Sequence, residues 1–368
     1  MVNVNINDKI LAVAPMMDLT DRHCRSFHRL LSKKAKLYSE MINTGAILYG
    51  DAHRHLDFDR DEHYVILQLG GSEPSDLAKA AKRGQEWGYD QIDLNCGCPS
   101  ERVQKGSFGA CLMAEPDLVA DCVKAMKDAV SIPVSVKHRL GLNEMNPDHP
   151  VDYQFALDFM CAVAQAGASQ VTIHARNAVL KGLSPKENRM IPLLRYDIAK
   201  RLRTDLQKHF PQVKVLLNGG LETNQMIQQH WNDFDGFMIG RAAYHTPAML
   251  LAWDRMIDSQ GQENGYFLND QTWLEIQEGI IRYSQSWLHQ LGGDQTERFY
   301  LAGITRHVLG LAHGLGGSRL WRQQLSDHRL IAPVKTDLQI EQFFTQASRH
   351  LRIFSDERDE SFTSQYDD

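Results

Sequence analysis

The chain has 368 residues, of which 43% are hydrophobic and 23% are charged, which is a globular composition with ample core and excludes a disordered polymer. The formal net charge of −6 excludes a uniformly basic protein. The N-terminal stretch MVNVNINDKILAVAPMMD has no basic region followed by an apolar run, and no stretch is apolar for long enough to cross a bilayer. We therefore expect a soluble, cytoplasmic protein with no membrane partner and with reduced cysteines.

Eight short apolar, β-branched runs recur along the chain and predict buried strands. They cover residues 10–16, 37–41, 64–70, 91–97, 133–141, 170–175, 213–220 and 236–241. Helical patterns lie between them, for example at 75–88, 115–130 and 151–167. Eight alternating strand and helix units predict an α/β fold of the (β/α)8 TIM-barrel type. A doubly wound sheet is the alternative, but no G-x-G-x-x-G follows the first strand.

After residue 260 the pattern is helical only, with apolar residues at helical spacing in 271–291 and further helical patterns in 298–315 and 337–354. We expect a catalytic barrel domain at 1–257, a small all-helical domain at 268–352 and an acidic, disordered tail at 353–368. The tail has six acidic residues and one arginine, a net −5. Residues 297–352 have eight Lys or Arg and four Asp or Glu, a net +4, so this domain can hold RNA through its local charge.

Nearly every predicted strand ends in side chains that are suited to catalysis or ligand binding. The active site of a barrel forms at the carboxyl ends of its strands, so eight such ends in register predict a site there. The strand-end groups are Pro15 with Met16, Glu40, Gln68, Asn95 to Cys98, Lys137 with Arg139, His174 with Arg176, Asn218 to Gly220, and Gly240 with Arg241.

The loops after the last two predicted strands indicate a phosphate site. Barrels frequently bind phosphate there through backbone N–H groups, and Gly219, Gly220 and Arg241 suit that use. The alternative is that these glycines only make tight turns. A metal is not expected, because the His and acidic residues lack compact ligand spacing.

Lys137, His174 and Gln68, at three other strand ends, suit a flavin. A cation can stabilise the anionic reduced ring, and an amide can hydrogen-bond the pyrimidine edge. FMN carries one phosphate, which matches a single phosphate site.

Cys96 and Cys98 stand one residue apart in the stretch LNCGCPSERVQKGSFGACLM, which allows a metal site, a disulfide or one reactive thiol. A reducing compartment disfavours the disulfide. A metal would need two more ligands, and Cys111 supplies only one further candidate.

Taken together, these motifs resemble the tRNA-dihydrouridine synthases, a family of FMN enzymes. Segments 180–194 and 304–311 resemble the subfamily that modifies tRNA positions 20 and 20a, and the resemblance covers about residues 8–350. The matching motifs are APMMDLTD (14–21), QLGG (68–71), DLNCGCP (93–99), KGSFGACLM (105–113), VKHRLG (136–141), IHAR (173–176), NGG (218–220) and IGR (239–241).

The resemblance implies an oxidoreductase in which NADPH (or NADH) reduces FMN, hydride passes to C6 of a D-loop uracil, and Cys98 donates the proton to C5. A free thiol has a pKa of about 8.5, so it is mostly protonated at neutral pH and can act as an acid. We expect a monomer with no metal that clamps tRNA between barrel and helical domain. The residues implied to hold FMN are Pro15, Met16, Met17, Gln68, Lys137, His174, Asn218, Gly219, Gly220, Gly240 and Arg241.

A uracil stacked in folded tRNA must be extruded before an enzyme can reach it. Asn95, three residues before the cysteine, can offer a donor and an acceptor to its edge. Lys186 and Arg189 are one helical turn apart and could face one phosphate track. Arg298 and Arg306 belong to the basic helical domain, and for all four cations the alternative is an ordinary solvated charge.

Two other functions stay open from the sequence. A different FMN barrel acting on a small molecule would share the phosphate site but gives no reason for a basic helical domain. A non-catalytic RNA-binding protein would not need Cys98, Lys137 and His174 at strand ends.

Overall fold

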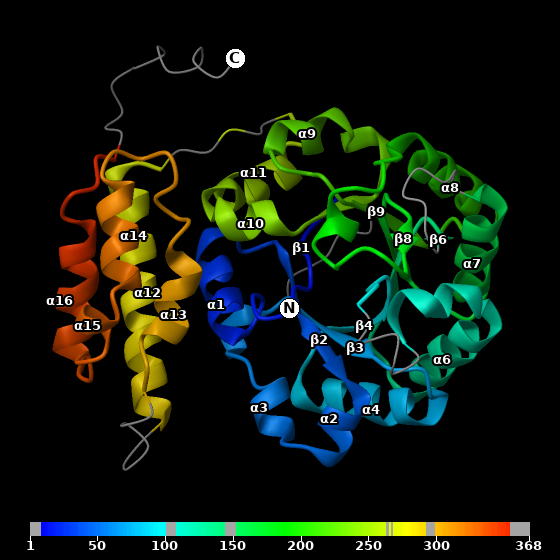
Figure 1. The fold of residues 1–368 in the computed structure, drawn as a ribbon, viewed down its shortest axis with the longest axis horizontal. Helices are drawn as coiled ribbons and strands as arrows, with labels where there is room; N and C mark the ends of the chain where they lie inside the picture. Colours follow the sequence, from blue (N-terminus) through cyan, green and yellow to red (C-terminus); the bar gives the residue numbers. More distant parts are fainter. Residues whose placement is uncertain are drawn as a thin grey trace.

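The computed structural model describes residues 9–100, 108–143, 152–262, 265, 268–291 and 299–353. These residues form a closed barrel of parallel strands surrounded by helices, with a separate group of helices beside the barrel (Figure 1). The predicted (β/α)8 barrel followed by a helical region is therefore confirmed. The domain bounds stay a prediction, and the tail from residue 354 onward lies outside the described residues.

All eight predicted strands are present, and they close the barrel in the order β1-β10-β9-β7-β5-β4-β3-β2. They are β1 (Ile10–Val13), β2 (Lys36–Asn43), β3 (Val65–Gly70), β4 (Gln91–Cys96), β5 (Val134–Arg139), β7 (Gln170–His174), β9 (Lys214–Asn218) and β10 (Gly236–Ile239). A pair that was not predicted, β6 (Leu142–Asn143) and β8 (Ala178–Val179), forms a two-stranded sheet beyond the ends of β5 and β7.

The barrel helices are α1 (Arg22–Leu31), α2 (Thr44–Tyr49), α3 (Ala52–Leu56), α4 (Pro74–Trp87), α6 (Pro116–Ala129), α7 (Tyr153–Gln165), α8 (Tyr196–His209), α9 (Asn224–Gln229), α10 (Arg241–His245) and α11 (Trp253–Asp258). The helical region contains α12 (Asp270–Leu291), α13 (Ala302–Val308), α14 (Ser318–Ser326), α15 (His328–Ile331) and α16 (Asp337–Ser348). Short 3-10 helices are η1 (Arg60–Glu62), η2 (Gly109–Ala114), η3 (Glu187–Arg189), η4 (Trp231–Asp233) and η5 (Pro247–Ala252). None of the helices in the described ranges has both the length and the apolar character needed to cross a bilayer.

Both faces of the strands are buried, and the face that packs against the helices is apolar. Every residue of β3, β4 and β10 is buried. Ala12, Tyr38, Ile66 and Met238 fill the barrel interior, and a larger apolar layer lies between the strands and the surrounding helices. A filled interior is the usual state of a (β/α)8 barrel, so a ligand site must form at the strand ends.

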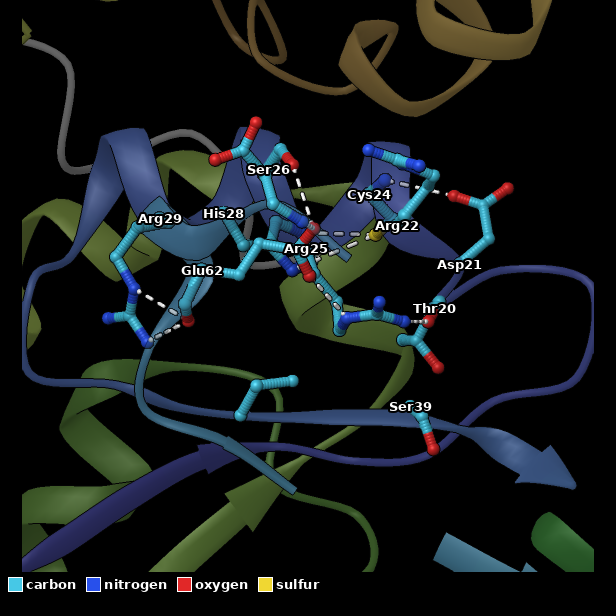
Figure 2. Close-up of polar contacts among 12 residues, drawn as sticks. Thr20, Asp21, Arg22, Cys24, Arg25, Ser26, His28, Arg29, Ser39 and Glu62 are labelled. Carbon is cyan, nitrogen blue, oxygen red and sulfur yellow. Dashed lines mark hydrogen bonds and ion pairs between the residues drawn. The ribbon is translucent and has the colours of Figure 1, made fainter. Parts of the chain in front are cut away.

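Helix α1 is tied to the β2–β3 connection by a buried ion pair (Figure 2). Glu62 is fully buried and accepts hydrogen bonds from Arg25 Nε at 2.6 Å, Ser26 Oγ at 3.1 Å and the Asp59 backbone N–H at 2.8 Å. The side chain of Arg29 donates to the Glu62 carbonyl oxygen at 3.1 Å. These bonds fix the face of α1 that points to the barrel.

The other side of α1 carries the helical region (Figure 1). Helix α12 approaches α1 closely at Gly279, where an added Cβ would lie 2.7 Å from Leu30 Cδ2. One turn further along α12, Tyr283 Oη lies 2.7 Å from His23 Nδ1. The barrel and the helical region therefore share α1 as a common packing element.

We predict that Glu62→Ala lowers the free energy of unfolding by about 3–5 kcal/mol, because the charge of Arg25 would stay buried without its partner. Urea unfolding measures this loss. The matched control is Glu278→Ala, whose ion pair with Arg282 is exposed and should change stability by less than about 1 kcal/mol. Equal effects of the two substitutions would contradict a structural role for the buried pair.

Candidate active site

Parallel strands in register bring the predicted site residues to one edge of the barrel. Each strand pairs with its neighbour near its carboxyl end, so the chemical groups that end the strands form a continuous ring. The paired residues around this edge are Gln68 with Asp93, Asn95 with Lys137, Arg139 with His174, and His174 with Asn218.

A chain of buried hydrogen bonds supports this edge. Asp93 is fully buried and accepts hydrogen bonds from Gln68 Nε2 at 2.8 Å and Ser135 Oγ at 2.6 Å. Burial raises the pKa of Asp93 to about 6, although these hydrogen bonds and the charge of Lys137 act in the opposite direction. Asn95 Nδ2 donates to Gln68 Oε1 at 2.9 Å. The sequence analysis missed Asp93 and Ser135, because only the pairing of β3, β4 and β5 gives them a shared role.

The backbone around Cys98 is held from three directions. Asn95 Oδ1 accepts the backbone N–H groups of Gly97 at 3.2 Å and Cys98 at 3.0 Å. Ala110 N donates to the Cys98 carbonyl oxygen at 2.9 Å, and Arg139 Nε donates to the Gly97 carbonyl oxygen at 2.8 Å. The Cys98 side chain is half-buried, and its sulfur has no hydrogen-bond partner in the described ranges. A fixed backbone with an open thiol suits a proton donor.

Buried guanidinium groups hold the segment after β7 in the same way. Arg139 Nη1 donates to the carbonyl oxygens of Asn177 at 3.1 Å and Asn188 at 3.0 Å. Arg176 Nη1 donates to the carbonyl oxygen of Met190 at 3.2 Å. Arg139 therefore connects the Cys98 loop to the segment that follows β7, a role that its position at a strand end did not reveal.

Three basic side chains at this edge have no hydrogen bond or ion pair among the described residues. They are Lys137, His174 and Arg241. Burial, followed by the charge of Arg139, lowers the pKa of Lys137 to about 8. Burial and the nearby charges of Arg139 and Lys137 lower the pKa of His174, so its imidazole is neutral at pH 7. These groups are available to an anionic ligand.

Gly219 and Gly220 follow β9 with φ angles of 103° and 68°, which glycine adopts without strain. An added Cβ at Gly219 would lie 2.6 Å from His174 Cδ2, and one at Gly220 would lie 2.4 Å from Leu194 Cδ1. The backbone here passes directly beside His174, so glycine is required by both conformation and space.

The other residues predicted to hold FMN surround the same edge. Pro15 and Met16 are half-buried after β1, and Met17 is 54% exposed. An added Cβ at Gly240 would lie 3.6 Å from Met16 Sδ, so the loops after β1 and β10 touch. Asn218 Nδ2 donates to a β10 carbonyl oxygen at 2.7 Å, which locks the end of β9 to β10.

The residues predicted to contact tRNA have different surroundings. Lys186 and Arg189 are exposed at the two ends of η3. Arg306 is also exposed, but it donates to the Asp18 carbonyl oxygen at 3.0 Å and pairs with the Asp21 carboxylate. Arg298 lies outside the described residues.

The cysteines and acidic residues give no sign of a metal centre in the part of the chain that the structure describes, where no three His, Cys, Asp or Glu side chains are placed to hold an ion. Cys96 is fully buried in the apolar layer, as a packing residue should be. The six cysteines are free thiols.

The basic side chains and the glycine backbone at this edge fit the chemistry of FMN. Lys137, His174 and Arg241 offer nitrogen groups that have no partner among the described residues, and Arg139 and Arg176 lie close enough to lower the pKa of His174. Such an excess of positive charge favours an anion. The positive φ angles at Gly219 and Gly220 let the backbone approach a phosphate.

The fold is a (β/α)8 barrel, and it gathers several basic side chains at the carboxyl ends of its strands. The dihydrouridine synthase family model matches residues 12–348, and the chain belongs to this family. It is 49% identical over 315 residues to the tRNA-dihydrouridine(20/20a) synthase of Pseudomonas putida, covering 86% of this chain and 87% of that protein. The protein of the same name from Synechocystis sp. is 47% identical over 328 residues, covering 89% and 92%.

We predict that FMN binds the protein less tightly as the pH rises through about 8. Lys137 carries its charge below its pKa of about 8 and loses it above, and an anion favours the charged form. The dissociation constant should rise by up to about tenfold per pH unit above that point. Flavin fluorescence titration of the FMN-free protein between about pH 7 and 10 avoids the titration of the phosphate near pH 6. Lys137→Met should bind FMN more weakly at pH 7 and should lack this pH dependence, and a retained dependence would assign it to another group.

Proposed function

We propose that this protein reduces uridine to 5,6-dihydrouridine in the D-loop of tRNA, at positions 20 and 20a, with FMN as cofactor and NADPH as reductant. The observation that carries the proposal is the half-buried Cys98, whose thiol has no hydrogen-bond partner among the described residues while its backbone is held by hydrogen bonds with Asn95 and Ala110. The names of the relatives, tRNA-dihydrouridine(20/20a) synthase, support the substrate and the positions.

FMN would be held by the groups at the carboxyl edge of the barrel. Gly219 and Gly220 with Arg241 suit its phosphate, and Lys137 suits the negative charge of the reduced ring. His174, neutral at pH 7, can hydrogen-bond the ring. When bound and reduced by NADPH, FMN supplies the hydride that adds to C6 of the uracil.

Cys98 supplies the matching proton to C5, so that the C5–C6 double bond becomes a single bond with one hydrogen added at each carbon. The S–H bond breaks, and its electron pair stays on sulfur as a thiolate that water reprotonates. The charges of Arg139 and Lys137 lie close enough to Cys98 to interact with this thiolate. They therefore stabilise the charge that develops on sulfur as the proton leaves.

The uracil must leave its stack to meet the thiol. Asn95 has one amide hydrogen left after its bond to Gln68, and this hydrogen can read a uracil carbonyl. Lys186 and Arg189, on the exposed segment after β7, suit the flanking phosphates.

We predict that Cys98→Ala retains FMN and oxidises NADPH at the normal rate but reduces uridine about 10²–10⁴-fold more slowly, because the proton is needed only in the second half-reaction. Flavin content, anaerobic reduction by NADPH and dihydrouridine in tRNA are measured separately. Cys111→Ala is the matched control, since its thiol donates to the Phe108 carbonyl oxygen instead of facing a free site.

Three outcomes would contradict the proposal at different points. A colourless protein that cannot be reconstituted with FMN would exclude the cofactor. A wild type that holds FMN but forms no dihydrouridine in tRNA would point to a small-molecule substrate. A Cys98→Ala variant with the normal rate would assign the proton to another group.

We also predict that Lys186→Ala with Arg189→Ala weakens tRNA binding and flattens its salt dependence. Each lost phosphate contact should reduce the logarithmic salt slope by roughly 0.7–0.9. FMN content and reduction by NADPH should not change. The control removes Lys124 and Lys208, exposed cations on the outer helices α6 and α8. If both double variants show the wild-type slope, Lys186 and Arg189 are ordinary surface charges.

A further inference from the structure

Three large apolar side chains are exposed together on the segment between η3 and α8. Met190 is 56% exposed, Ile191 is 43% exposed and Leu193 is 59% exposed. We refer to these three residues as the apolar rim. Single exposed apolar residues are common, but three within four positions form a patch that water disfavours, and such patches often mark a contact surface.

Hydrogen bonds from buried side chains hold the backbone of the apolar rim. Arg176 Nη1 donates to the carbonyl oxygens of Met190, at 3.2 Å, and Pro192. Asn188 is fully buried, and its side chain accepts a hydrogen bond from Val179 N at 2.8 Å and donates to the Val179 carbonyl oxygen at 2.9 Å. The exposed side chains therefore stand on an ordered support, so that little further conformational freedom is lost when they bind a partner.

The apolar rim lies beside the candidate active site. The next residue, Leu194, packs directly on Gly220, and Arg195 N donates to the Ala175 carbonyl oxygen at 2.9 Å. Arg139 connects the same segment to the Cys98 loop through Asn188. The exposed cations Lys186 and Arg189 immediately precede the rim, so apolar and basic groups lie next to each other at the mouth of the site.

We propose that the apolar rim contacts the RNA stack from which the target uridine is extruded and fills the space that the base leaves. This inference rests on the proposed function and deepens it, since it names the part of the chain that holds the substrate open. Extrusion breaks base stacking, and proteins that unstack nucleic acid commonly insert apolar side chains at the vacated step. The neighbouring cations would hold the backbone phosphates on either side, which selects RNA over an uncharged apolar partner.

The test is the variant Met190→Gln, Ile191→Thr, Leu193→Gln, which replaces the apolar side chains by polar ones of similar or slightly smaller size. Its control is Leu274→Gln with Leu338→Gln, which alters exposed apolar residues on α12 and α16. Single-turnover formation of dihydrouridine is measured on intact tRNA and on tRNA with an abasic nucleotide beside the target, where less stacking must be broken.

We expect the rim variant to keep its FMN and its reaction with NADPH, to react at least tenfold more slowly than wild type on intact tRNA, and to recover most of that loss on the abasic tRNA. The control variant should match wild type on both RNAs. If the triple variant loses FMN, the single substitution Leu193→Gln carries the same comparison.

Equal rates of variant and wild type on intact tRNA would overturn the inference, and so would an equal loss on both RNAs. The alternative is that a second copy of the chain covers the apolar rim, and sedimentation of the RNA-free proteins tests it. A wild-type dimer that the rim substitutions dissociate would show that the rim is a subunit contact and overturn the inference. If wild type forms no dihydrouridine on either RNA, the proposed function fails and this inference fails with it, whereas an active wild type separates the two.

Discussion

The buried guanidinium of Arg139 is the constraint on which the candidate site depends. It has no carboxylate partner among the described residues and instead donates to the carbonyl oxygens of Gly97, Asn177 and Asn188. A buried cation is tolerated only when its donors are satisfied, so these three carbonyl groups must stay in place around it. The Cys98 loop and the exposed segment after β7 are thereby fixed relative to each other. A thiol that must meet a base held in RNA needs this kind of relative placement, because small displacements of reacting groups cost large factors in rate.

The charge balance at the carboxyl ends of the strands also depends on how few carboxylates lie beside the basic groups. The carboxyl group of Asp93 acts on Lys137 as an opposite charge, and although burial raises its pKa to about 6, it is mostly ionised at pH 7. Lys137 also interacts with the charge of Arg139, so the positive charges at this edge outnumber this one carboxylate. Burial, and after it the charges of Arg189 and Arg176, lower the pKa of Arg139 to about 10, and burial with the neighbouring cations also lowers the pKa of His174, because like charges repel one another. An anion that enters this site relieves that repulsion, so its binding is favoured before any specific contact is counted. Burial and the charge of Arg241 also lower the pKa of Arg189, so the positive charge of the edge extends to the segment after β7.

The sequence alone predicted the barrel because its signal is local. Each strand is a short apolar run that ends in polar groups, and the strand-end rule then places Gln68, Lys137, His174 and Gly219 at one edge without knowledge of any contact. The supporting interactions could not be predicted, because they join residues from strands and loops far apart in the chain. Asp93 acquires its role only from the side chains of Gln68 and Ser135, and Arg139 acquires its role only from carbonyl groups that are 38 to 49 residues away in the chain. Composition likewise marked Arg306 as an RNA-binding cation, yet the structure pairs it with Asp21, a contact that a count of charges cannot detect.

The ion pair between Arg306 and Asp21 means that the helical region also holds part of the barrel, in addition to offering a basic surface. Asp21 caps α1 by accepting the Cys24 N–H at 3.0 Å, and it also binds Arg306 and His307 of α13. The loop that leads to Asp21 from β1 contains Met16, whose backbone N–H donates to Thr20 Oγ1 at 2.9 Å, and Asp18, whose carbonyl oxygen accepts from Arg306. The helical region therefore holds the loop after β1, and this loop carries three of the residues expected to contact FMN. The helical region is in this way a structural part of the barrel mouth, because the loop after β1 is bonded to α13 as well as to its own barrel.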